Sequence, residues 1–424
     1  MSHWWEREGL ECRDGRLRIA GRDAEELART HGTPLFVFDL DYAVAQLRAL
    51  QHAFQGAGLR HCVRVSMKAL RTPEFLAAVR AMGRPGSPES VGLDASSPQE
   101  AVHGLANGLL PQEISLTGTN LSDEDLALVV DEDIHVNVDL VSQIRRIGRL
   151  SPGRRIGIRV NPKCGYVNPR VDHSITLYSG EAPTKFGIYE EDLPLAVATA
   201  HEHAMTIDTA HFHVFNGILT DDLPAVGEAL AHVRRHVELL IELGCPIAEI
   251  NVGGGLGIPW HPGQRPLDLD AWAGLLAGHL GDLGAVISCE PGEYVSMQSA
   301  VLLAEAITVE ERLGHLFAGL NVGWNVCAHR FVYKIDLNAI HTTRAGDRSA
   351  RSVTFSGNIN EGPDLFVEDL PFPAVEEGDI VALYPAGAYT LSNYHPHCLR
   401  PPGRELYLSR TPDIAAVAGE RARE

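Results

Sequence analysis

The most regular feature of the chain is an alternation, over its first 300 residues, of short apolar runs with amphipathic stretches. Eight of the runs predict strands. Their carboxyl ends lie near Ser66, Asp94, Thr117, Val138, Val160, His213, Val252 and Glu290. Amphipathic spacing predicts helices over 73–82, 98–107, 123–130, 224–243 and 269–280. Strands that alternate with helices in this way are typical of a parallel α/β fold.

The number of strands favours a closed (β/α)8 TIM barrel over residues 42–300, since such barrels take roughly 250 residues. A doubly wound open sheet is the alternative. A local signal supports the helix over 98–107: Ser97 precedes Pro98, and Glu100 follows Ser97 by three residues, which is the pattern of a capping box with proline at the first helical position.

From residue 301 the pattern changes to strand-like runs with little helix between them. This texture predicts a second, mainly antiparallel β domain over 301–424. We expect residues 1–41 to form an N-terminal segment that contributes to this β domain. The last dozen residues are expected to be a loose tail.

Composition narrows the class of protein. The formal charge is −19, from 36 basic and 55 acidic residues without an acidic block, which argues against nucleic acid or a membrane as partner. Seven scattered cysteines without a CxxC pair argue against a disulfide framework or a metal site. The chain has neither a signal-like N-terminus nor an apolar run near 18 residues, so we expect a cytoplasmic protein.

Polar residues at strand ends are the candidate chemistry, because these ends converge on one mouth of a barrel. Each candidate, taken singly, also has an ordinary structural interpretation. A lysine can be a surface charge, a run of glycines a tight loop, a histidine part of the core, and a glutamate the end of a strand. The residues found at successive strand ends are Lys68, Asn161, His211, His213, Gly253, Gly254, Gly255, Gly257 and Glu290.

Together these residues suit pyridoxal phosphate. Lys68 offers an amine for a Schiff base, and we expect burial to lower its pKa and make it nucleophilic. The glycine loop lets backbone N–H groups approach a phosphate. Glu290 could keep the pyridine nitrogen protonated, which makes the ring a strong electron sink. His213 could lie flat against the ring.

Several motifs also occur in a familiar order. They are TPLFVFD from Thr33, SMKAL around Lys68, GLDASSPQE from Gly92, RVNP from Arg159, TKFGI from Thr184, HFHVFNG from His211, NVGGGLG from Asn251, EPGEYV from Glu290, GNINEGPD from Gly357 and AGAY ending at Tyr389. With them the chain resembles the alanine-racemase-type (fold type III) pyridoxal-phosphate decarboxylases. Within these it is most similar to the diaminopimelate decarboxylases, with ornithine decarboxylases as more distant relatives.

The resemblance implies a carboxy-lyase and assigns cofactor contacts. Lys68 would be the Schiff-base lysine, with His213 stacked on the ring and Glu290 on the pyridine nitrogen. The phosphate and ring would be contacted by Asn216, Gly253, Gly254, Gly255, Gly292 and Tyr389. It also implies a homodimer with shared active sites, in which Asn360 and Glu361 reach the partner's cofactor.

Three departures concern substrate and phosphate. Asn216 replaces the serine of HIGS-type motifs. Glu293 replaces the arginine of EPGR, which contacts phosphate and substrate in the diaminopimelate branch. For the substrate's distal end, an ungapped reading gives His329 and Tyr333, with Arg330 adjacent. Ordinary diaminopimelate decarboxylation is therefore in doubt.

The departure with the largest chemical consequence is Asn360, which stands where the family's CESGD motif has its cysteine. That cysteine reprotonates Cα, and an asparagine amide is too weak an acid for this step. Candidate replacements are Lys68, Tyr389, His329, Cys327 or a water held by Glu361, with Lys68 ranked first.

We interpret the chain as a pyridoxal-phosphate-dependent decarboxylase of an amino acid or derivative. The departures favour a specialised substrate, such as a siderophore or other secondary-metabolite precursor, or an aminoacyl group tethered to a carrier protein. The competing interpretations are an ordinary diaminopimelate decarboxylase, a non-catalytic pyridoxal-phosphate-binding regulatory homologue, and a racemase. The last is disfavoured because racemases of this fold place an arginine, not a carboxylate such as Glu290, on the ring nitrogen.

Overall fold

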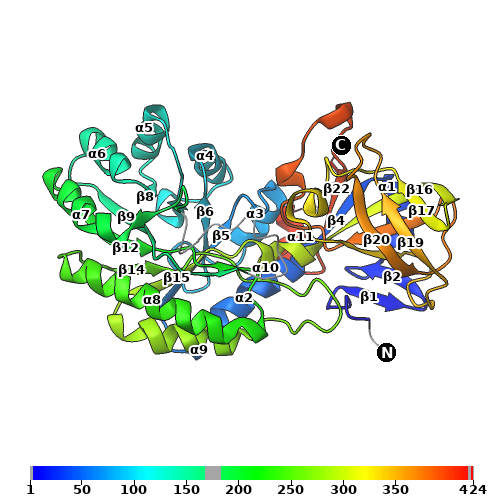
Figure 1. The fold of residues 1–424 in the computed structure, drawn as a ribbon, viewed down its shortest axis with the longest axis horizontal. Coiled ribbons are helices and arrows are strands. Elements are labelled where there is room, and N and C mark those ends of the chain that lie inside the picture. The colour runs from blue at the N-terminus through cyan, green and yellow to red at the C-terminus, as the bar shows by residue number, and fades with distance from the viewer. Residues whose placement is uncertain (1–2, 168–182, 419–421, 424) are drawn as a thin grey trace.

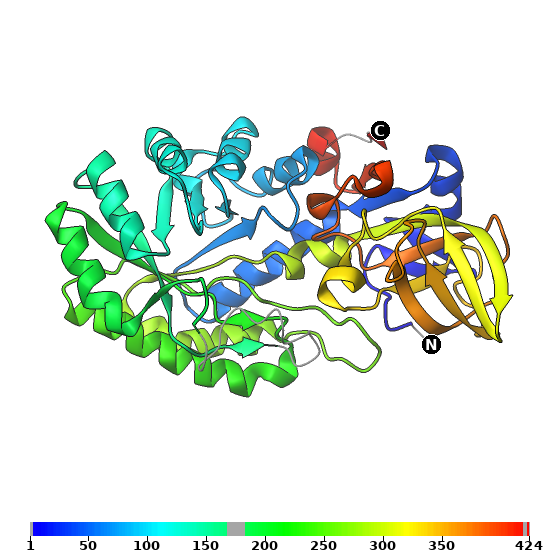
Figure 2. The same cartoon turned by 45° about the horizontal axis from the view of Figure 1, so that its top comes forward.

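A barrel and a β domain lie side by side in the computed structural model, which describes residues 3–167, 183–418 and 422–423 (Figures 1 and 2). Eight parallel strands form the barrel, and pairing of its fourth and fifth strands closes it. They are β5 (His61–Ser66), β6 (Val91–Ala95), β7 (Ile114–Leu116), β8 (His135–Val138), β9 (Arg155–Asn161), β12 (Thr206–His211), β14 (Glu249–Asn251) and β15 (Val286–Cys289). The predicted TIM barrel is confirmed.

Helices surround this barrel on its outer side (Figure 1). They are α2 (Leu40–Gly56), α3 (Pro73–Arg80), α4 (Pro98–Ala106), α5 (Asp123–Asp131), α6 (Val141–Leu150), α7 (Leu193–Glu202), α8 (Leu223–Glu242) and α9 (Leu269–Leu280). The five predicted helices are confirmed, and α2, α6 and α7 were not predicted. Short elements at the mouth are β10 (Tyr166–Val167), β11 (Ile188–Tyr189), β13 (Phe215–Asn216) and α10 (Glu293–Ser296).

The start of α4 follows the predicted capping pattern with one difference. The Ser97 hydroxyl accepts a hydrogen bond from the Glu100 N–H at 3.2 Å, and Pro98 occupies the first turn. The Glu100 carboxylate reaches back one residue further than predicted, to the Ser96 N–H at 2.7 Å. Both contacts satisfy N–H groups that the helix itself cannot pair.

Replacing Ser97 with alanine is expected to lower the free energy of unfolding by about 1 kcal/mol, because the cap hydrogen bond is lost. Chemical denaturation measures this change. Thr72 is a matched control, since it precedes α3 and its proline without a side-chain cap bond. If Thr72→Ala costs as much as Ser97→Ala, the cap bond is not the source of the stability.

The β domain is built from both ends of the chain. Its strands are β4 (Leu35–Asp39), β16 (Ala300–Arg312), β17 (His315–Leu320), β18 (Asn338–His341), β19 (Arg351–Ser356), β20 (Leu365–Phe372), β21 (Ile380–Tyr384), β22 (Arg404–Leu408) and β23 (Ala422–Arg423). All pairs are antiparallel except β17 with β19 and β4 with β22, so the predicted mainly antiparallel character is confirmed. At the N-terminus, β1 (Leu10–Arg13), β2 (Arg16–Ile19) and β3 (Arg22–Asp23) form a small sheet beside α1 (Ala24–His31).

Residues 300–304 of strand β16 are all apolar, and their place in the fold explains why. Val301 and Leu303 pack into one buried cluster, with the N-terminal segment, while Leu302 and Ala304 on the other face pack into the cluster that fills the barrel. Because successive side chains of a strand point to opposite faces, a strand covered on both sides is apolar throughout.

The tail was expected to be loose, but its described part is ordered. Helix α11 (Pro412–Ala418) packs against α3, and β23 pairs with β22. In the ranges that the structure describes, no helix has both the length and the apolarity to cross a membrane.

Candidate active site

A cavity of about 510 Å³ opens at the carboxyl ends of the barrel strands and is closed on one side by loops of the β domain. Eleven of the predicted site residues line it, which are Lys68, His213, Asn216, Gly254, Gly255, Glu290, Gly292, Glu293, His329, Tyr333 and Tyr389. Gly253, Arg330, Asn360 and Glu361 do not line it, and neither do the strand-end candidates Asn161, His211 and Gly257. The cavity thus brings together most of the residues that the strand ends and motifs indicated.

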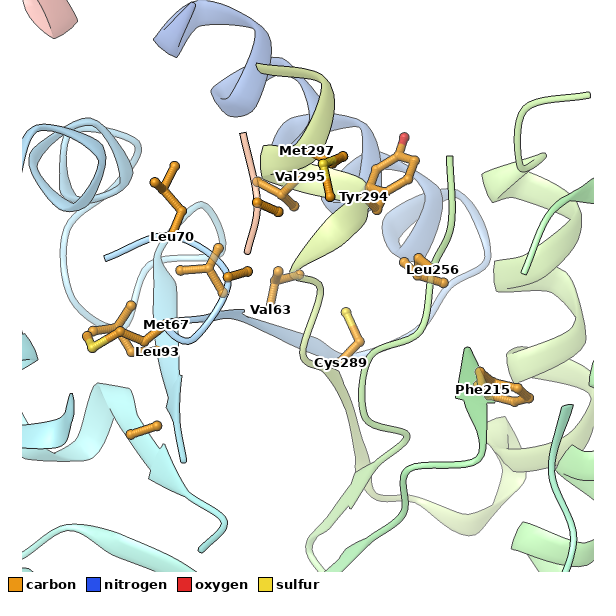
Figure 3. Close-up of a cluster of buried hydrophobic side chains, with 14 of the residues drawn as sticks. Val63, Met67, Leu70, Leu93, Phe215, Leu256, Cys289, Tyr294, Val295 and Met297 are labelled. Atoms are coloured by element: carbon orange, nitrogen blue, oxygen red, sulfur yellow. The ribbon is translucent and has the colours of Figure 1, made fainter. Parts of the chain in front are cut away.

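Lys68 is held at the cavity by the burial of its neighbours. Met67 and Leu70 are buried in the hydrophobic cluster shown in Figure 3, and the Met67 N–H donates to the Asp94 carbonyl at 2.9 Å. Lys68 itself is exposed, whereas the sequence suggested burial. The apolar run that precedes it fills the core, and the amine faces the open cavity instead.

Tyr389 connects the β domain to this lysine turn. Its backbone N–H donates to the Ala69 carbonyl at 3.0 Å. Gly292 lies close to its hydroxyl, since a Cβ on Gly292 would be 3.0 Å from both the Tyr389 hydroxyl and the Ala69 Cβ. Burial raises the pKa of Tyr389, with Glu293 adding to the shift. The phenol is therefore neutral.

Glu290 follows β15 and is buried, with both carboxylate oxygens paired. Asn251 donates to Oε1 at 2.7 Å, and His211 Nε2 lies 3.2 Å from Oε2. Burial alone would raise the pKa of Glu290, but the His211 ring and these hydrogen bonds lower it to about 2. The group is a fixed negative charge at neutral pH.

His213 and the glycine loop hold each other in place. The Gly254 N–H donates to His213 Nδ1 at 3.3 Å. Burial lowers the pKa of His213, and the nearby Lys68 and Arg159 lower it further. The imidazole is therefore neutral, with Nδ1 as the acceptor and the proton on Nε2.

The loop after β14 requires its glycines. Gly255 has φ +88°, and a Cβ there would be 2.1 Å from the Phe215 carbonyl oxygen. A Cβ on Gly254 would be 2.5 Å from the Glu290 carbonyl oxygen. Gly253 lies outside the cavity wall, but its carbonyl accepts the Glu290 N–H at 2.8 Å. This loop therefore brings bare backbone to the cavity and anchors the residue that follows β15.

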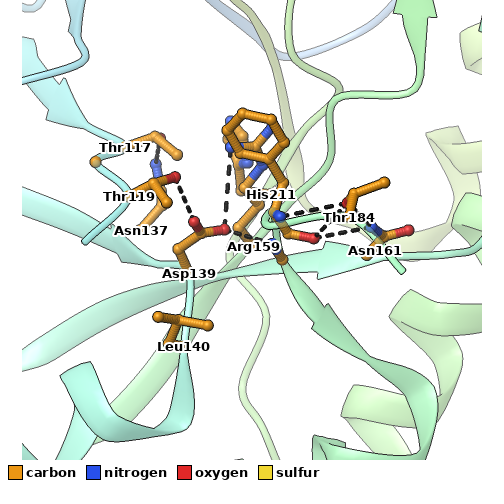
Figure 4. A network of polar contacts seen from close by, with 12 residues as sticks. Thr117, Thr119, Asn137, Asp139, Leu140, Arg159, Asn161, Thr184 and His211 are labelled. Atoms are coloured by element: carbon orange, nitrogen blue, oxygen red, sulfur yellow. Dashed lines mark hydrogen bonds and ion pairs between the residues drawn. The ribbon is translucent and has the colours of Figure 1, made fainter. Parts of the chain in front are cut away.

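A polar network joins side chains from the carboxyl ends of neighbouring barrel strands (Figure 4). Buried Asp139 accepts hydrogen bonds from the Thr119 hydroxyl and the Gly187 N–H, both at 2.5 Å. Arg159 lies 4.0 Å from Asp139. Asn161, a candidate from its strand end, donates to the Thr184 hydroxyl at 3.1 Å and so holds the loop that leads to β11. Its contacts are structural.

The β-domain side of the cavity carries the residues that depart from the family pattern. The Trp260 Nε1–H donates to Glu293 Oε1 at 2.9 Å, and burial raises the pKa of Glu293 to about 7. Burial lowers the pKa of His329 to about 4, so this ring is neutral. Arg330 turns away and pairs with Asp336 at 2.5 Å and with Glu368.

Two predicted residues lie on the surface. Asn360 and Glu361 are exposed, and Glu361 lies 3.2 Å from His397 Nε2. The turn that carries them is fixed by buried Asp364, which accepts the Ile359 N–H at 2.6 Å and the Trp324 N–H at 2.7 Å. Neither Asn360 nor Glu361 can contact the cavity of its own chain in this arrangement.

Asp94 and Trp260 are two of the cavity residues that sequence reasoning missed. Asp94 accepts the Ser66 hydroxyl at 2.9 Å, and burial together with Glu290 raises its pKa to about 7, partly opposed by Lys68. Its position at the end of a predicted strand was a usable signal. Trp260, in the loop after the glycines, had none, because its contact with Glu293 depends on how that loop folds.

The residues present fit pyridoxal phosphate. An amine, an ionised buried carboxylate and a loop of bare backbone border one cavity, and side chains on Gly254 or Gly255 would collide with backbone oxygens. These are the partners that an aldehyde, a protonated ring nitrogen and a phosphate require.

Comparison with known proteins agrees that the chain is suited to bind pyridoxal phosphate. Residues 40–297 match the family described as "Pyridoxal-dependent decarboxylase, pyridoxal binding domain". The chain is 34% identical over 402 residues to the diaminopimelate decarboxylase of Methanothermobacter thermautotrophicus, covering 92% of this chain and 90% of that one. It is 28% identical to that of Escherichia coli K12, covering 89% and 90%. The diaminopimelate decarboxylase of M. jannaschii shares the fold, with a TM-score of 0.84 at 23% identity over 96% of this chain and 97% of that one.

Proposed function

Because the chain belongs to the pyridoxal-dependent decarboxylase family and is a pyridoxal-phosphate-dependent carboxy-lyase, we propose that it decarboxylates a specialised amino acid or amino-acid derivative rather than free diaminopimelate. The observation that carries this proposal is Glu293, a carboxyl on the cavity wall where the diaminopimelate branch has a substrate-binding arginine. Carrier-tethered aminoacyl groups and siderophore precursors are specialised substrates of this kind.

Three residues of the cavity have a proposed part in holding the aldehyde and the ring of the cofactor. Pyridoxal phosphate, when bound, supplies the electron sink for loss of carbon dioxide. Lys68 would hold its aldehyde, and ionised Glu290 would keep its ring nitrogen protonated. Neutral His213 would cover the ring without adding a positive charge.

The phosphate would be bound mainly by backbone and neutral groups. Gly255 offers an N–H group, with Asn216 and Tyr389 as side-chain partners, whereas the Gly254 N–H already donates to His213 Nδ1. Gly253 would act indirectly, by anchoring Glu290, and Gly292 would leave space for the Tyr389 hydroxyl. Glu293 cannot replace the charge of the family's arginine at this position.

We propose Lys68 as the acid that returns a proton to Cα. Burial raises the pKa of Tyr389, and it raises that of the Cys327 thiol to about 12. Both are therefore weak donors at neutral pH. His329, with its pKa lowered to about 4, carries no extra proton to give. Lys68 remains as an amine on the cavity side of its turn.

A homodimer would give Asn360 and Glu361 a role. Because both are exposed and lie outside the cavity of their own chain, they could serve only the site of a second subunit. We propose that they do so, with Glu361 holding a water or the substrate, and that the substrate enters as a free amino acid or on a carrier protein.

Ordinary diaminopimelate decarboxylation is the second candidate, because relatives that cover most of the chain carry that name. A racemase and a non-catalytic regulatory homologue are less well supported. Ionised Glu290 disfavours the racemase, and a regulatory homologue would have no need of a complete set of cofactor partners.

A decarboxylation screen tests the proposal. Carbon dioxide release is measured for free diaminopimelate, lysine, ornithine, arginine and glutamate, and for carrier-tethered and citrate-linked analogues. We expect at least one compound to exceed meso-diaminopimelate in kcat/KM by about 100-fold, which corresponds to about 3 kcal/mol, the cost of leaving one buried polar group unpaired. Rapid turnover of meso-diaminopimelate would favour the second candidate. A yellow protein that releases no carbon dioxide from any compound would favour the regulatory homologue.

A further inference from the structure

One wall of the cavity combines an acid with aromatic rings. We define the distal wall as Trp260, Glu293, His329 and Tyr333, all of which line the cavity. Trp260 donates to Glu293 at 2.9 Å, its ring centroid lies 5.7 Å from that of His329, and the His329 and Tyr333 rings are 6.0 Å apart. These contacts make the four residues one continuous surface.

The carboxyl of Glu293 has no positive partner on this surface. Its hydrogen-bond donor, the Trp260 indole, is uncharged. Among the described residues it forms no ion pair, and no arginine lines the cavity. Lys334 also borders the cavity, but its amine donates to the Phe331 carbonyl at 3.0 Å. Glu293 is therefore an acid without an ion-pair partner among the described residues, although the Lys334 amine also borders the cavity.

The other members of the distal wall are neutral. The His329 ring is uncharged because burial lowers its pKa to about 4, and burial raises the pKa of Tyr333. Nearby Asp336 is compensated by Arg330 outside the cavity. A carboxylate beside aromatic faces is the surroundings in which proteins bind ammonium and guanidinium groups. On the four residues of the distal wall, a carboxylate-ended ligand would meet an acid and no cation.

We propose that the distal wall binds a positively charged distal end of the substrate, an ammonium or guanidinium group, and disfavours a distal carboxylate. The inference rests on the proposed function, because the other end of the substrate is taken to occupy the Lys68 side of the cavity. It also narrows the screen: lysine, ornithine and arginine types of substrate are favoured over citrate-linked ones.

Three amines that differ only at one end test this selectivity. They are 1,5-diaminopentane, pentylamine and 5-aminopentanoate. None has a carboxylate beside its amine carbon, so none can be decarboxylated as the proposed substrates are. Equilibrium binding to the cofactor-loaded protein is measured by calorimetry and by the near-visible absorbance. We expect 1,5-diaminopentane to bind most tightly, and about tenfold or more tighter than 5-aminopentanoate, the scale of one charge-assisted contact.

Substitutions at position 293 identify the group responsible. Glu293→Gln keeps the acceptor for Trp260 and should bring 1,5-diaminopentane to the affinity of pentylamine. Glu293→Arg should reverse the order in favour of 5-aminopentanoate. Glu311→Gln, an exposed acid paired with Arg351 on the β domain, is the matched control and should leave the order unchanged.

Two results would overturn the inference. One is tighter binding of 5-aminopentanoate than of 1,5-diaminopentane to the unmodified protein, which would mean that a protonated Glu293 donates to a carboxylate. The other is an unchanged order in Glu293→Gln, which decides the question even if Glu293→Arg fails to fold. If the order holds but no amino acid is decarboxylated, the proposed function fails and the selectivity stands. If an amino acid is decarboxylated but this order of binding is not found, the proposed function stands and the selectivity of the distal wall fails.

Discussion

Lys68→Ala is expected to lose covalent cofactor attachment and to lower the decarboxylation rate at least on the order of 10³-fold, as removal of a nucleophile does in other enzymes. The physical reason is position: Met67 and Leu70 are anchored in the core, so the amine of Lys68 is presented to the cavity that also contains Glu290 and Gly254. Borohydride reduction followed by peptide mass analysis measures the attachment. The modified peptide should be the one that contains Lys68, and the near-visible absorbance should be lost in the variant.

The chain offers a simple control for this experiment because it has only four lysines, at positions 68, 163, 185 and 334. Lys163 is exposed and pairs with Glu191, away from the cavity lining. Lys163→Ala should keep both the absorbance and the rate. Reduction that labels another lysine, or an absorbance that persists in Lys68→Ala, would contradict the proposed role of Lys68.

The barrel could be predicted from sequence because its strands are buried on both faces and so read as short apolar runs. The site followed from the barrel, since Lys68 and Glu290 come directly after runs of this kind and strand ends share one mouth. The missed helices differ in their signals. α6 buries Ile144 and Ile147 on one face and carries the spacing of a helix, whereas α7 is alanine-rich and apolar over most of its length.

What the sequence could not provide are contacts between segments with no fixed spacing. The bond between Trp260 and Glu293 depends on a loop after β14 folding toward α10. Arg330 was a candidate for the substrate by adjacency, yet its charge is taken up by Asp336 and by Glu368, 38 residues away. Both cases depend on the direction in which a loop side chain points. The position of a residue after a strand or within a motif does not determine that direction.

Glu290→Gln is expected to retain the cofactor on Lys68 but to lower the decarboxylation rate on the order of 10²- to 10³-fold, the cost of losing one preorganised electrostatic partner. An amide cannot keep a ring nitrogen protonated. An ordinary glutamate takes up a proton near pH 4.5. Because the pKa of Glu290 is lowered to about 2, its carboxylate stays ionised through that range and below it. Between pH 5 and 9 the rate should therefore show no step from this residue, and substitution is the way to remove its charge.

Glu249→Gln separates this chemical effect from a general loss of packing. Glu249 begins β14 at the opposite end of the barrel, where it accepts two hydrogen bonds from Arg64, at 2.6 and 3.1 Å, and one from Ser288 at 2.5 Å. Both substitutions weaken a hydrogen-bonded carboxylate network, which is buried at Glu290 and half-buried at Glu249, so thermal denaturation should show a loss of stability in each. Only Glu290→Gln should slow decarboxylation with the near-visible absorbance retained. Equal slowing in the two variants would mean that Glu290 acts through the fold, by holding His211 and Asn251, and not through the cofactor.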